Sequence, residues 1–296
     1  MKKRPFLLAS LTIGAIFLFF LLVIFTAGLL KGSSIVVPVG NTLGILEVRG
    51  MIGDSEHLIE QIEDFRDSRS VKAVVLRIDS PGGGVGPSQE IHAELLRLAE
   101  QKPLIVSMGS VAASGGYYLA VAGERIFANP GTITGSIGVI MSFPDYQELM
   151  GKVGIKTEVV KSGRFKDIGS STRPFTDSDR ELLQKMIDDV QAQFVEAVSE
   201  GRKIPLERLQ PYVDGRIFTG RQALAIGLID ELGTMQDAIR YAAKVAGLGD
   251  EPTLVYPKPE KKDFLERLIQ GAASRYLGVM IRPQLSAGPQ YLWDGI

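Results

Sequence analysis

The stretch Met108-Gly-Ser-Val-Ala-Ala-Ser-Gly-Gly-Tyr-Tyr118 ends the apolar run Leu104-Ile-Val-Ser-Met108 with a series of small residues. The apolar run predicts a buried strand, and the small and apolar residues at 115–122 predict a buried helix. Ser114 therefore lies at a strand-to-helix turn, where the unpaired N–H groups of a helix N-terminus favour developing negative charge. This position suits a nucleophile, although an ordinary helix-capping serine has the same pattern.

Strand and helix patterns alternate before this turn. Residues 43–49 and 71–78 are predicted strands, and Ser55 is expected to cap a helical pattern between them. A helix is also expected from about residue 87 to 101. The order of strand, helix, strand, helix, strand, helix, with crossovers long enough for parallel pairing, predicts an α/β fold built in layers.

The pattern after the turn predicts shorter strands and several helices. Strands are expected at residues 125–128, 138–143 and 156–160, with a short helix at 146–150. Thr176 or Asp177 is expected to cap a long amphipathic helix that ends near Gly201. A turn, a strand and a capped helix are expected at 214–223, and another helix at 235–246. The pattern weakens from Pro252 onwards.

The composition excludes several classes of site. The chain has 296 residues and a net charge of −1, which gives no indication of nucleic-acid binding. The absence of cysteine excludes disulfides, structural thiolate zinc sites and a thiol nucleophile. The two histidines, His57 and His92, both fall in or near helical patterns, where a solvated or packed histidine is expected rather than a catalytic base. We expect no cofactor and no metal.

The N-terminus predicts a membrane anchor. Lys2, Lys3 and Arg4 precede an uncharged run at residues 5–30. A helix of about 25 residues is roughly 37 Å long, which exceeds the ~30 Å hydrocarbon core of a bilayer. A cleaved signal peptide is the alternative, but Phe25-Thr-Ala27 fits a cleavage site poorly. We expect an uncleaved single-pass anchor in the cell membrane, with the chain after it extracytoplasmic.

A nucleophilic Ser114 needs donors for the oxyanion and a base. The segment Asp79-Ser-Pro-Gly-Gly-Gly84 leaves the carboxyl end of a predicted strand, and its glycines can bring bare N–H groups close to a substrate. The N–H groups of Gly83 and Gly115 would form an oxyanion hole. A phosphate cradle is the alternative, but both common nucleotide-binding glycine spacings are missing.

A lysine is the remaining choice for the base, because no histidine lies at a strand end. Burial lowers the pKa of a lysine, since desolvation disfavours the ammonium form. Lys161 and Lys166 flank Ser-Gly-Arg-Phe, and either could turn inward. Both could equally be solvated on a loop.

Five motifs occur in one order along the chain. They are Ser-Pro-Gly-Gly-Gly (80–84), Met-Gly-Ser-Val-Ala-Ala-Ser-Gly-Gly-Tyr-Tyr (108–118), Thr-Gly-Ser-Ile-Gly-Val (134–139), Lys-Ser-Gly-Arg-Phe-Lys-Asp (161–167) and Asp-Gly-Arg-Ile-Phe-Thr-Gly-Arg-Gln-Ala (214–223). Together they closely resemble the short, single-domain form of the bacterial signal peptide peptidase A (SppA) family, whose fold is similar to that of ClpP and crotonase. The resemblance extends from about residue 42 to about residue 246.

This resemblance implies a Ser–Lys dyad, with Ser114 as the nucleophile and Lys166 as the general base, and makes Lys161 a flanking residue. It assigns Gly83 to the oxyanion loop and makes Ser136 the hydroxyl that orients the lysine. Members of the family form rings, octameric in similar proteins, in which a neighbouring subunit can supply the lysine. Their substrates are peptides, namely signal peptides left in the membrane after preprotein processing.

The resemblance also implies a domain organisation. We expect a cytoplasmic stub and anchor at 1–31, a linker at 32–41, a peptidase domain at 42–250 and an unassigned tail at 251–296. No second copy of the motifs occurs, which excludes the duplicated long form. A membrane-anchored scaffold that binds partners without cleaving them is one alternative. Acyl-CoA chemistry on a crotonase-like fold is another, but it lacks a well-placed acidic residue and leaves the membrane span unexplained.

Overall fold

The computed structural model describes residues 18–19, 41–257 and 289–293. The chain divides into two compact units, residues 1–39 and 40–296, and the second is described below. The predicted membrane span at 5–30 lies outside the described residues, apart from Leu18 and Phe19. Within the part of the chain that the structure describes, no helix is both long enough and apolar enough to cross a membrane.

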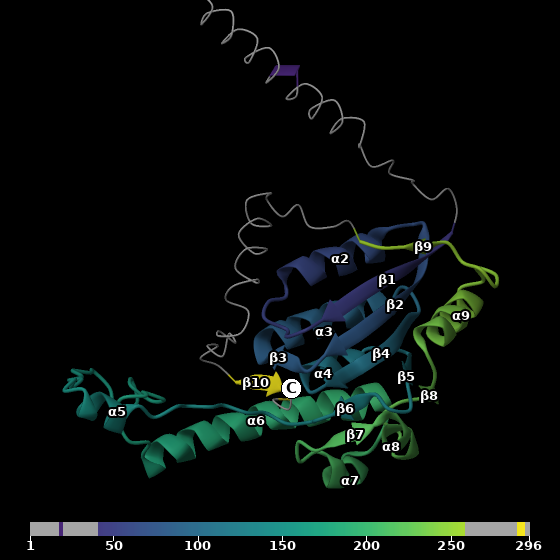
Figure 1. Cartoon of the computed structure of the whole chain (residues 1–296). Helices are drawn as coiled ribbons and strands as arrows, with labels where there is room; N and C mark the ends of the chain where they lie inside the picture. The colour runs from purple at the N-terminus through teal and green to yellow at the C-terminus, as the bar shows by residue number, and fades with distance from the viewer. Residues whose placement is uncertain (1–17, 20–40, 258–288, 294–296) are drawn as a thin grey trace, which may run out of the picture. The chain divides into compact units, whose positions relative to one another are not determined.

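A largely parallel sheet forms the centre of the second unit (Figure 1). Its strands are β1 (Thr42–Arg49), β2 (Val71–Ser80), β4 (Leu104–Ala113), β5 (Arg125–Ala128), β6 (Ile133–Gly135), β7 (Ile217–Thr219), β8 (Glu231–Leu232) and β9 (Leu254–Val255). The order is β7-β6-β4-β2-β1-β9, and β5 pairs with β4 and β8. Strands β6 and β7 pair antiparallel, whereas the other neighbours run parallel.

Helices cover both faces of this sheet. On one face, the strand residues Leu46 and Leu76 share a core with α2 (Glu56–Asp67), α3 (Val85–Ala99), α4 (Gly115–Ala120) and α6 (Asp177–Arg202). On the other face, Ile45 and Val75 pack with α9 (Met235–Val245). Because both faces are covered, the central strands are apolar almost throughout. This arrangement confirms the layered α/β fold.

Shorter elements complete the described chain. They are β3 (Gly82–Gly84), α5 (Gln147–Lys152), α7 (Leu206–Leu209), the 3-10 helix η1 (Gln210–Tyr212), α8 (Gly220–Ala225) and β10 (Gln290–Leu292). Strand β10 pairs antiparallel with β3 in a separate two-stranded sheet. Two segments far apart in the sequence thus meet beside the strand-to-helix turn that precedes α4 (Figure 1).

Two predicted strands are not formed. In residues 138–143, only Ile140 makes a bridge, and its partner is Gln290. Residues 156–160 have no regular secondary structure, and both Val159 and Val160 are exposed. Alternating apolar residues predict a strand only where a neighbouring strand supplies hydrogen-bond partners, and none is formed with this segment in the described structure. Conversely, β6 was not predicted.

The helix starts differ in how they are capped. Helix α2 begins after Ser55, as predicted, but the predicted cap is wrong, because the Ser55 hydroxyl donates to Glu90 and makes no hydrogen bond to the helix N-terminus. Helix α6 begins with a capping box, in which Thr176 and Asp179 each bond the other's backbone N–H. The capping box confirms the predicted start of the long helix.

Candidate active site

Ser114 occupies a strained turn between β4 and α4. Its backbone has φ 52° and ψ −118°, a conformation that costs an L-residue of order 1–3 kcal/mol and occurs preferentially at functional sites. The backbone N–H of Ser114 donates to the carbonyl of Gly135, at 2.8 Å. The Ser114 side chain is buried, and its hydroxyl has no hydrogen-bond partner among the described residues. The backbone conformation of Ser114 therefore fixes the position of a hydroxyl that is buried and has no hydrogen bond of its own among the described residues.

The predicted oxyanion glycines lie beside this turn. Gly82 has φ +104°, and a Cβ there would be 2.7 Å from the backbone nitrogen of Gly115. A Cβ on Gly83 would be 2.1 Å from the carbonyl oxygen of Ile52. Only residues without a side chain allow these backbones to approach so closely. The fold thus brings the glycine strand β3 and the first residue of α4 together next to Ser114.

Ser136 lies one residue beyond the backbone partner of Ser114. Its φ is 51°, its side chain is buried, and its backbone N–H donates to the carbonyl of Arg216 at 2.8 Å. Ser136 therefore lies near Ser114 in a second strained turn.

Ser88, which the sequence analysis did not identify, also lies beside this turn. Its hydroxyl is buried, has no partner among the described residues, and would be 2.8 Å from a Cβ on Gly115. Only its position on the buried face of α3 could have indicated it.

The two candidate lysines lie elsewhere in the chain, in the loop between α5 and α6. Lys166 is exposed, and its backbone N–H donates to the carbonyl of Gly163. Figure 1 shows α5 well away from β3 and α4. Lys161 donates through Nζ to Asp167 at 2.6 Å and to the carbonyl of Arg164 at 3.1 Å. Within this chain, neither lysine is a hydrogen-bond partner of Ser114.

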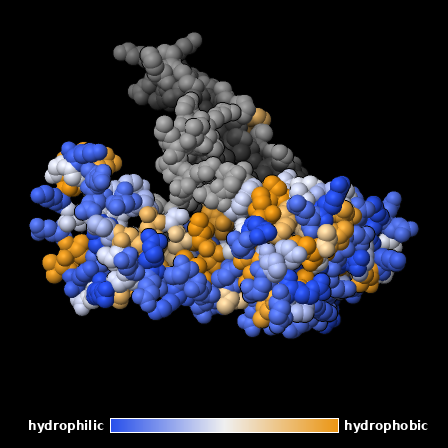
Figure 2. All heavy atoms as spheres, turned by 90° about the horizontal axis from the view of Figure 1, so that it is seen from below, coloured by the Kyte–Doolittle hydropathy of each residue, from blue (hydrophilic) through white to orange (hydrophobic). Residues whose placement is uncertain are grey.

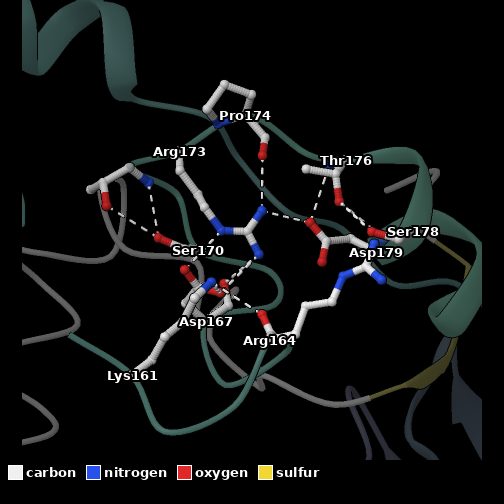
Figure 3. Close-up of polar contacts among 10 residues, drawn as sticks. Lys161, Arg164, Asp167, Ser170, Arg173, Pro174, Thr176, Ser178 and Asp179 are labelled. Carbon is white, nitrogen blue, oxygen red and sulfur yellow. Dashed lines mark hydrogen bonds and ion pairs between the residues drawn. The ribbon is translucent and has the colours of Figure 1, made fainter. Parts of the chain in front are cut away.

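An ion-pair cluster supports this loop (Figure 3). The Arg173 guanidinium donates to Asp179 at 2.5 Å and to Asp167 at 3.0 Å. The hydrogen bonds from Arg173, and then that from Lys161, lower the pKa of Asp167 to about 2. The cluster ties the loop that carries Lys166 to the capped start of α6.

The C-terminal strand β10 contacts the glycine strand directly. Tyr291 lies opposite Gly83 in the antiparallel pairing, and Gln290 exchanges two hydrogen bonds of 3.0 Å with Ile140. The sequence alone assigns no role to this tail. In residues 289–293, the local sequence indicates a strand only through the apolar triplet Tyr291-Leu-Trp293, which follows Pro289 and Gln290.

The two histidines both contact residues of helices. His57 contacts Gln61 on α2, and the ring of His92 lies 4.7 Å from that of Tyr118. Burial lowers the pKa of His92 to about 4. Among the described residues, no group of three or more histidines and acidic side chains is arranged to hold a metal ion.

Comparison with known proteins identifies similar chains. The model of peptidase family S49 matches residues 97–249, a segment that contains Ser114, Gly115, Ser136 and Lys166. A candidate protease of Synechocystis is 41% identical over 76% of this chain and 82% of its own length. A candidate signal peptide peptidase SppA of Enterococcus faecium is 32% identical over 79% and 69%. The chloroplastic serine protease SPPA of Arabidopsis thaliana is 34% identical over 86% and 39%.

Proposed function

Because the chain belongs to peptidase family S49 and its relatives confirm the resemblance to the SppA family, we propose that it is a serine endopeptidase with a Ser–Lys dyad. Ser114 is the nucleophile. The observation that carries this proposal is its buried hydroxyl, unpaired among the described residues, on a strained turn next to Gly115, whose backbone closely approaches Gly82. Such a turn holds a nucleophile beside preorganised N–H donors.

The reaction proceeds in two displacements. The neutral amine of Lys166 accepts the proton of the Ser114 hydroxyl while the oxygen attacks the peptide carbonyl carbon. The N–H groups of Gly83 and Gly115 donate to the oxyanion. The C–N bond then breaks, and Lys166 gives its proton to the leaving amine. Water, deprotonated by the same lysine, hydrolyses the acyl-enzyme ester and restores the serine. Ser136 orients the lysine.

We propose that Lys166 acts on the Ser114 of a neighbouring subunit in a ring. The exposed position of Lys166 and the unpaired Ser114 in a single chain both support this arrangement. Further support comes from large exposed apolar side chains in α5 and in the loop after it, which also carries Lys166. They are Leu149, Val153, Ile155, Val159 and Val160. Figure 2 shows hydrophobic residues among hydrophilic ones at the end of the molecule that carries α5. Exposed apolar clusters of this kind are typical of subunit interfaces.

The proposed substrates are signal peptides left in the membrane and other membrane-associated peptides. The apolar run at residues 5–30 would anchor the enzyme in the cell membrane, with the catalytic domain on the extracytoplasmic side. An anchored peptidase meets such substrates at the bilayer surface, where their apolar segments are confined.

The test is complementation between two inactive variants. We expect Ser114→Ala and Lys166→Ala each to abolish cleavage of a reporter peptide, because each removes one member of the dyad. Co-expression of the two should restore part of the activity, since a mixed ring contains sites with an intact serine and an intact lysine from different subunits. Lys185→Ala, which removes an exposed lysine on α6, is the control and should remain fully active.

Each outcome separates the alternatives. Full activity in either single variant would eliminate the dyad. Inactive single variants that fail to complement each other would place both groups in one subunit. A scaffold without activity would show no cleavage in the unaltered protein.

A further inference from the structure

The sheet leaves a pocket open where strand β4 changes its partner. Residues 105–107 pair with β5, whereas residues 111–113 pair with β6. The segment between them, the link from β5 to β6 and Arg77 on β2 surround an open pocket of about 430 Å³. Pockets of this size typically bind small ligands. In the described structure, none of the residues proposed for catalysis lines this pocket.

Arg77 supplies the pocket with a positive charge and with spare hydrogen-bond donors. Its Nη1 donates to the Ser107 hydroxyl at 2.8 Å and to the Met108 carbonyl at 2.9 Å. A guanidinium has five N–H donors, of which these bonds use two, so the other three have no hydrogen-bond partner among the described residues. Partial burial lowers the pKa of Arg77, because desolvation disfavours the charged form. An anion bound to the spare donors would offset that cost.

Two neutral donors line the pocket beside the guanidinium. The Asn129 amide donates through Nδ2 to the same Met108 carbonyl at 3.4 Å, so the amide and the guanidinium share one anchor. Ser110 is exposed, and its hydroxyl makes no hydrogen bond with the residues that the structure describes. A planar fork of N–H donors matches the two oxygens of a carboxylate. The donor set therefore suits a carboxylate ligand.

The charges around Arg77 favour a ligand with a single negative charge. Asp79, Glu47 and Arg49 all act on Arg77. Glu47 is paired with Arg49 at 3.0 Å, and Asp79 accepts a hydrogen bond from the N–H of Val111 at 3.1 Å. With Arg77, these side chains carry two positive and two negative charges, so Asp79 would repel a doubly charged phosphate more strongly than a carboxylate.

The pocket also has an apolar wall, which separates the possible sources of the carboxylate. Val111 and Ile133 lie opposite each other in the pairing of β4 with β6, and both line the pocket. The last residue of a peptide can bring a carboxylate and an apolar side chain together, whereas an acidic side chain brings only the carboxylate. The combination of donors and apolar wall therefore fits a chain end.

We propose that this pocket binds the C-terminal residue of a peptide, with the carboxylate on Arg77 and an apolar side chain against Val111 and Ile133. The proposal does not depend on the catalytic roles of Ser114 and Lys166. Val111 and Ile133 each precede one of the two strained serines by three residues, a distance of roughly 10 Å along a strand. A bound chain end thus contacts both strands that lead into the strained turns.

Peptide binding tests the proposal without any catalysis. The probes are dansyl-Ala-Leu with a free carboxylate and dansyl-Ala-Leu-amide, titrated into the full-length protein and followed by fluorescence. We expect about tenfold weaker binding of the amide, because charge-assisted hydrogen bonds are lost. Equal affinities would overturn the proposal. Dansyl-Ala-Glu-amide carries its carboxylate on a side chain, and binding as tight as that of the acid would overturn the assignment to a chain end.

Variants place the carboxylate in the pocket. Arg77→Gln should weaken binding of the acid about tenfold and leave that of the amide unchanged. Arg69→Gln, which removes an exposed arginine after α2, is the control. Ser110→Asp adds a negative charge at an exposed position of the pocket and should also weaken binding of the acid, so the test does not depend on whether Arg77→Gln folds. Gln101→Glu adds the same charge after α3 as its control. Unchanged binding of the acid in either folded pocket variant would refute the site.

Amide hydrogen exchange in the unaltered protein locates the bound peptide. We expect the acid to slow exchange in residues 109–113 and 129–135, because it contacts both strands, and the amide at the same concentration to have little effect. Slower exchange confined to residues 82–84 and 115–120 would place the peptide in the proposed active site and would refute the proposal.

Discussion

Ser114 and Ser136 adopt nearly equal positive φ angles of 52° and 51°, and the backbone N–H of Ser114 is bonded to Gly135, the residue immediately before Ser136. Each conformation is costly for a residue with a side chain. The two strained turns thus support each other at the point where β4 and β6 end. The proposed nucleophile and the hydroxyl proposed to orient the lysine are coupled through one backbone bond.

This coupling predicts the effect of Gly135→Ala. Gly135 has φ +80°, and a Cβ would be 2.6 Å from the ring of Phe218, so the turn must move. We expect a loss of more than about 1 kcal/mol in the free energy of unfolding, with a larger fall in kcat than in substrate affinity, since Ser114 shifts. Urea unfolding and steady-state kinetics measure the two effects.

Gly131→Ala is the matched control for this prediction. A Cβ at Gly131 meets nothing within 4 Å, and its φ is not positive. Its free energy of unfolding should stay within about 0.5 kcal/mol of the unaltered protein. A Gly135→Ala variant as stable and active as this control would show that the turn does not position the serine.

The Arg173 cluster predicts a local effect on the loop that carries Lys166. In Arg173→Ala, the nearly fully buried Asp179 loses its guanidinium partner, and Asp167 keeps only Lys161. We expect about tenfold faster hydrogen exchange in residues 161–179, with little change in β1 and β2, and reduced activity because Lys166 is less well placed. Arg173→Lys should restore little, since a lysine cannot bridge two carboxylates with a planar fork.

The exposed pair of Lys185 and Glu181 provides the control for the cluster. Lys185→Ala removes a surface ion pair on the same helix and should leave exchange in residues 161–179 unchanged. Equal exchange in Arg173→Ala and Lys185→Ala would show that the cluster does not stabilise the loop.

Acid should weaken the same cluster. Hydrogen bonds from Arg173 lower the pKa of both Asp167, to about 2, and Asp179. A carboxyl with a lowered folded-state pKa contributes stability above its unfolded pKa of about 3.9 and loses it as the pH falls towards the folded value. The difference in loop exchange between the unaltered chain and Arg173→Ala should therefore be constant above about pH 5 and shrink between about pH 4 and 2. A difference independent of pH would contradict the ion pairing.

The sequence predicts the centre of the fold well, for a physical reason. Strands β1, β2 and β4 are covered on both faces, so their apolar runs are continuous and leave a strong local signal. Ser114 becomes a candidate by the same logic, because the break in such a run is visible locally. The alternation at residues 156–160 is equally visible, yet no described strand pairs with it.

The parts that sequence reasoning missed depend on distant partners. Tyr291 owes its burial to Tyr118 and Phe194, which lie far away along the chain. Lys161 and Lys166 have similar surroundings in the sequence, and only the resemblance to the SppA family separated them. The structure adds a physical difference, since Lys161 is engaged by Asp167.

His92 gives a prediction about moderate acid. Burial beside Tyr118 lowers the pKa of His92 to about 4, against about 6.5 in an unfolded chain. The unfolded state therefore binds a proton first, so stability is complete above about pH 6.5 and falls by up to about 1.4 kcal/mol per pH unit as the pH drops towards 4. Between pH 7 and 5, this amounts to about 2 kcal/mol.

Urea unfolding at pH 7 and pH 5 isolates this contribution. His92→Phe keeps an aromatic ring against Tyr118 but cannot bind a proton, so it should lose about 2 kcal/mol less than the unaltered protein over this range. His57→Gln, which removes the other histidine, should lose as much as the unaltered protein. Because Tyr118 also packs against Tyr291, the protection of residues 289–293 from amide exchange, measured relative to the intrinsic exchange rate at each pH, should fall at pH 5 in the unaltered protein and not in His92→Phe. Equal losses in His92→Phe and the unaltered chain would show that His92 is not kept neutral by its burial.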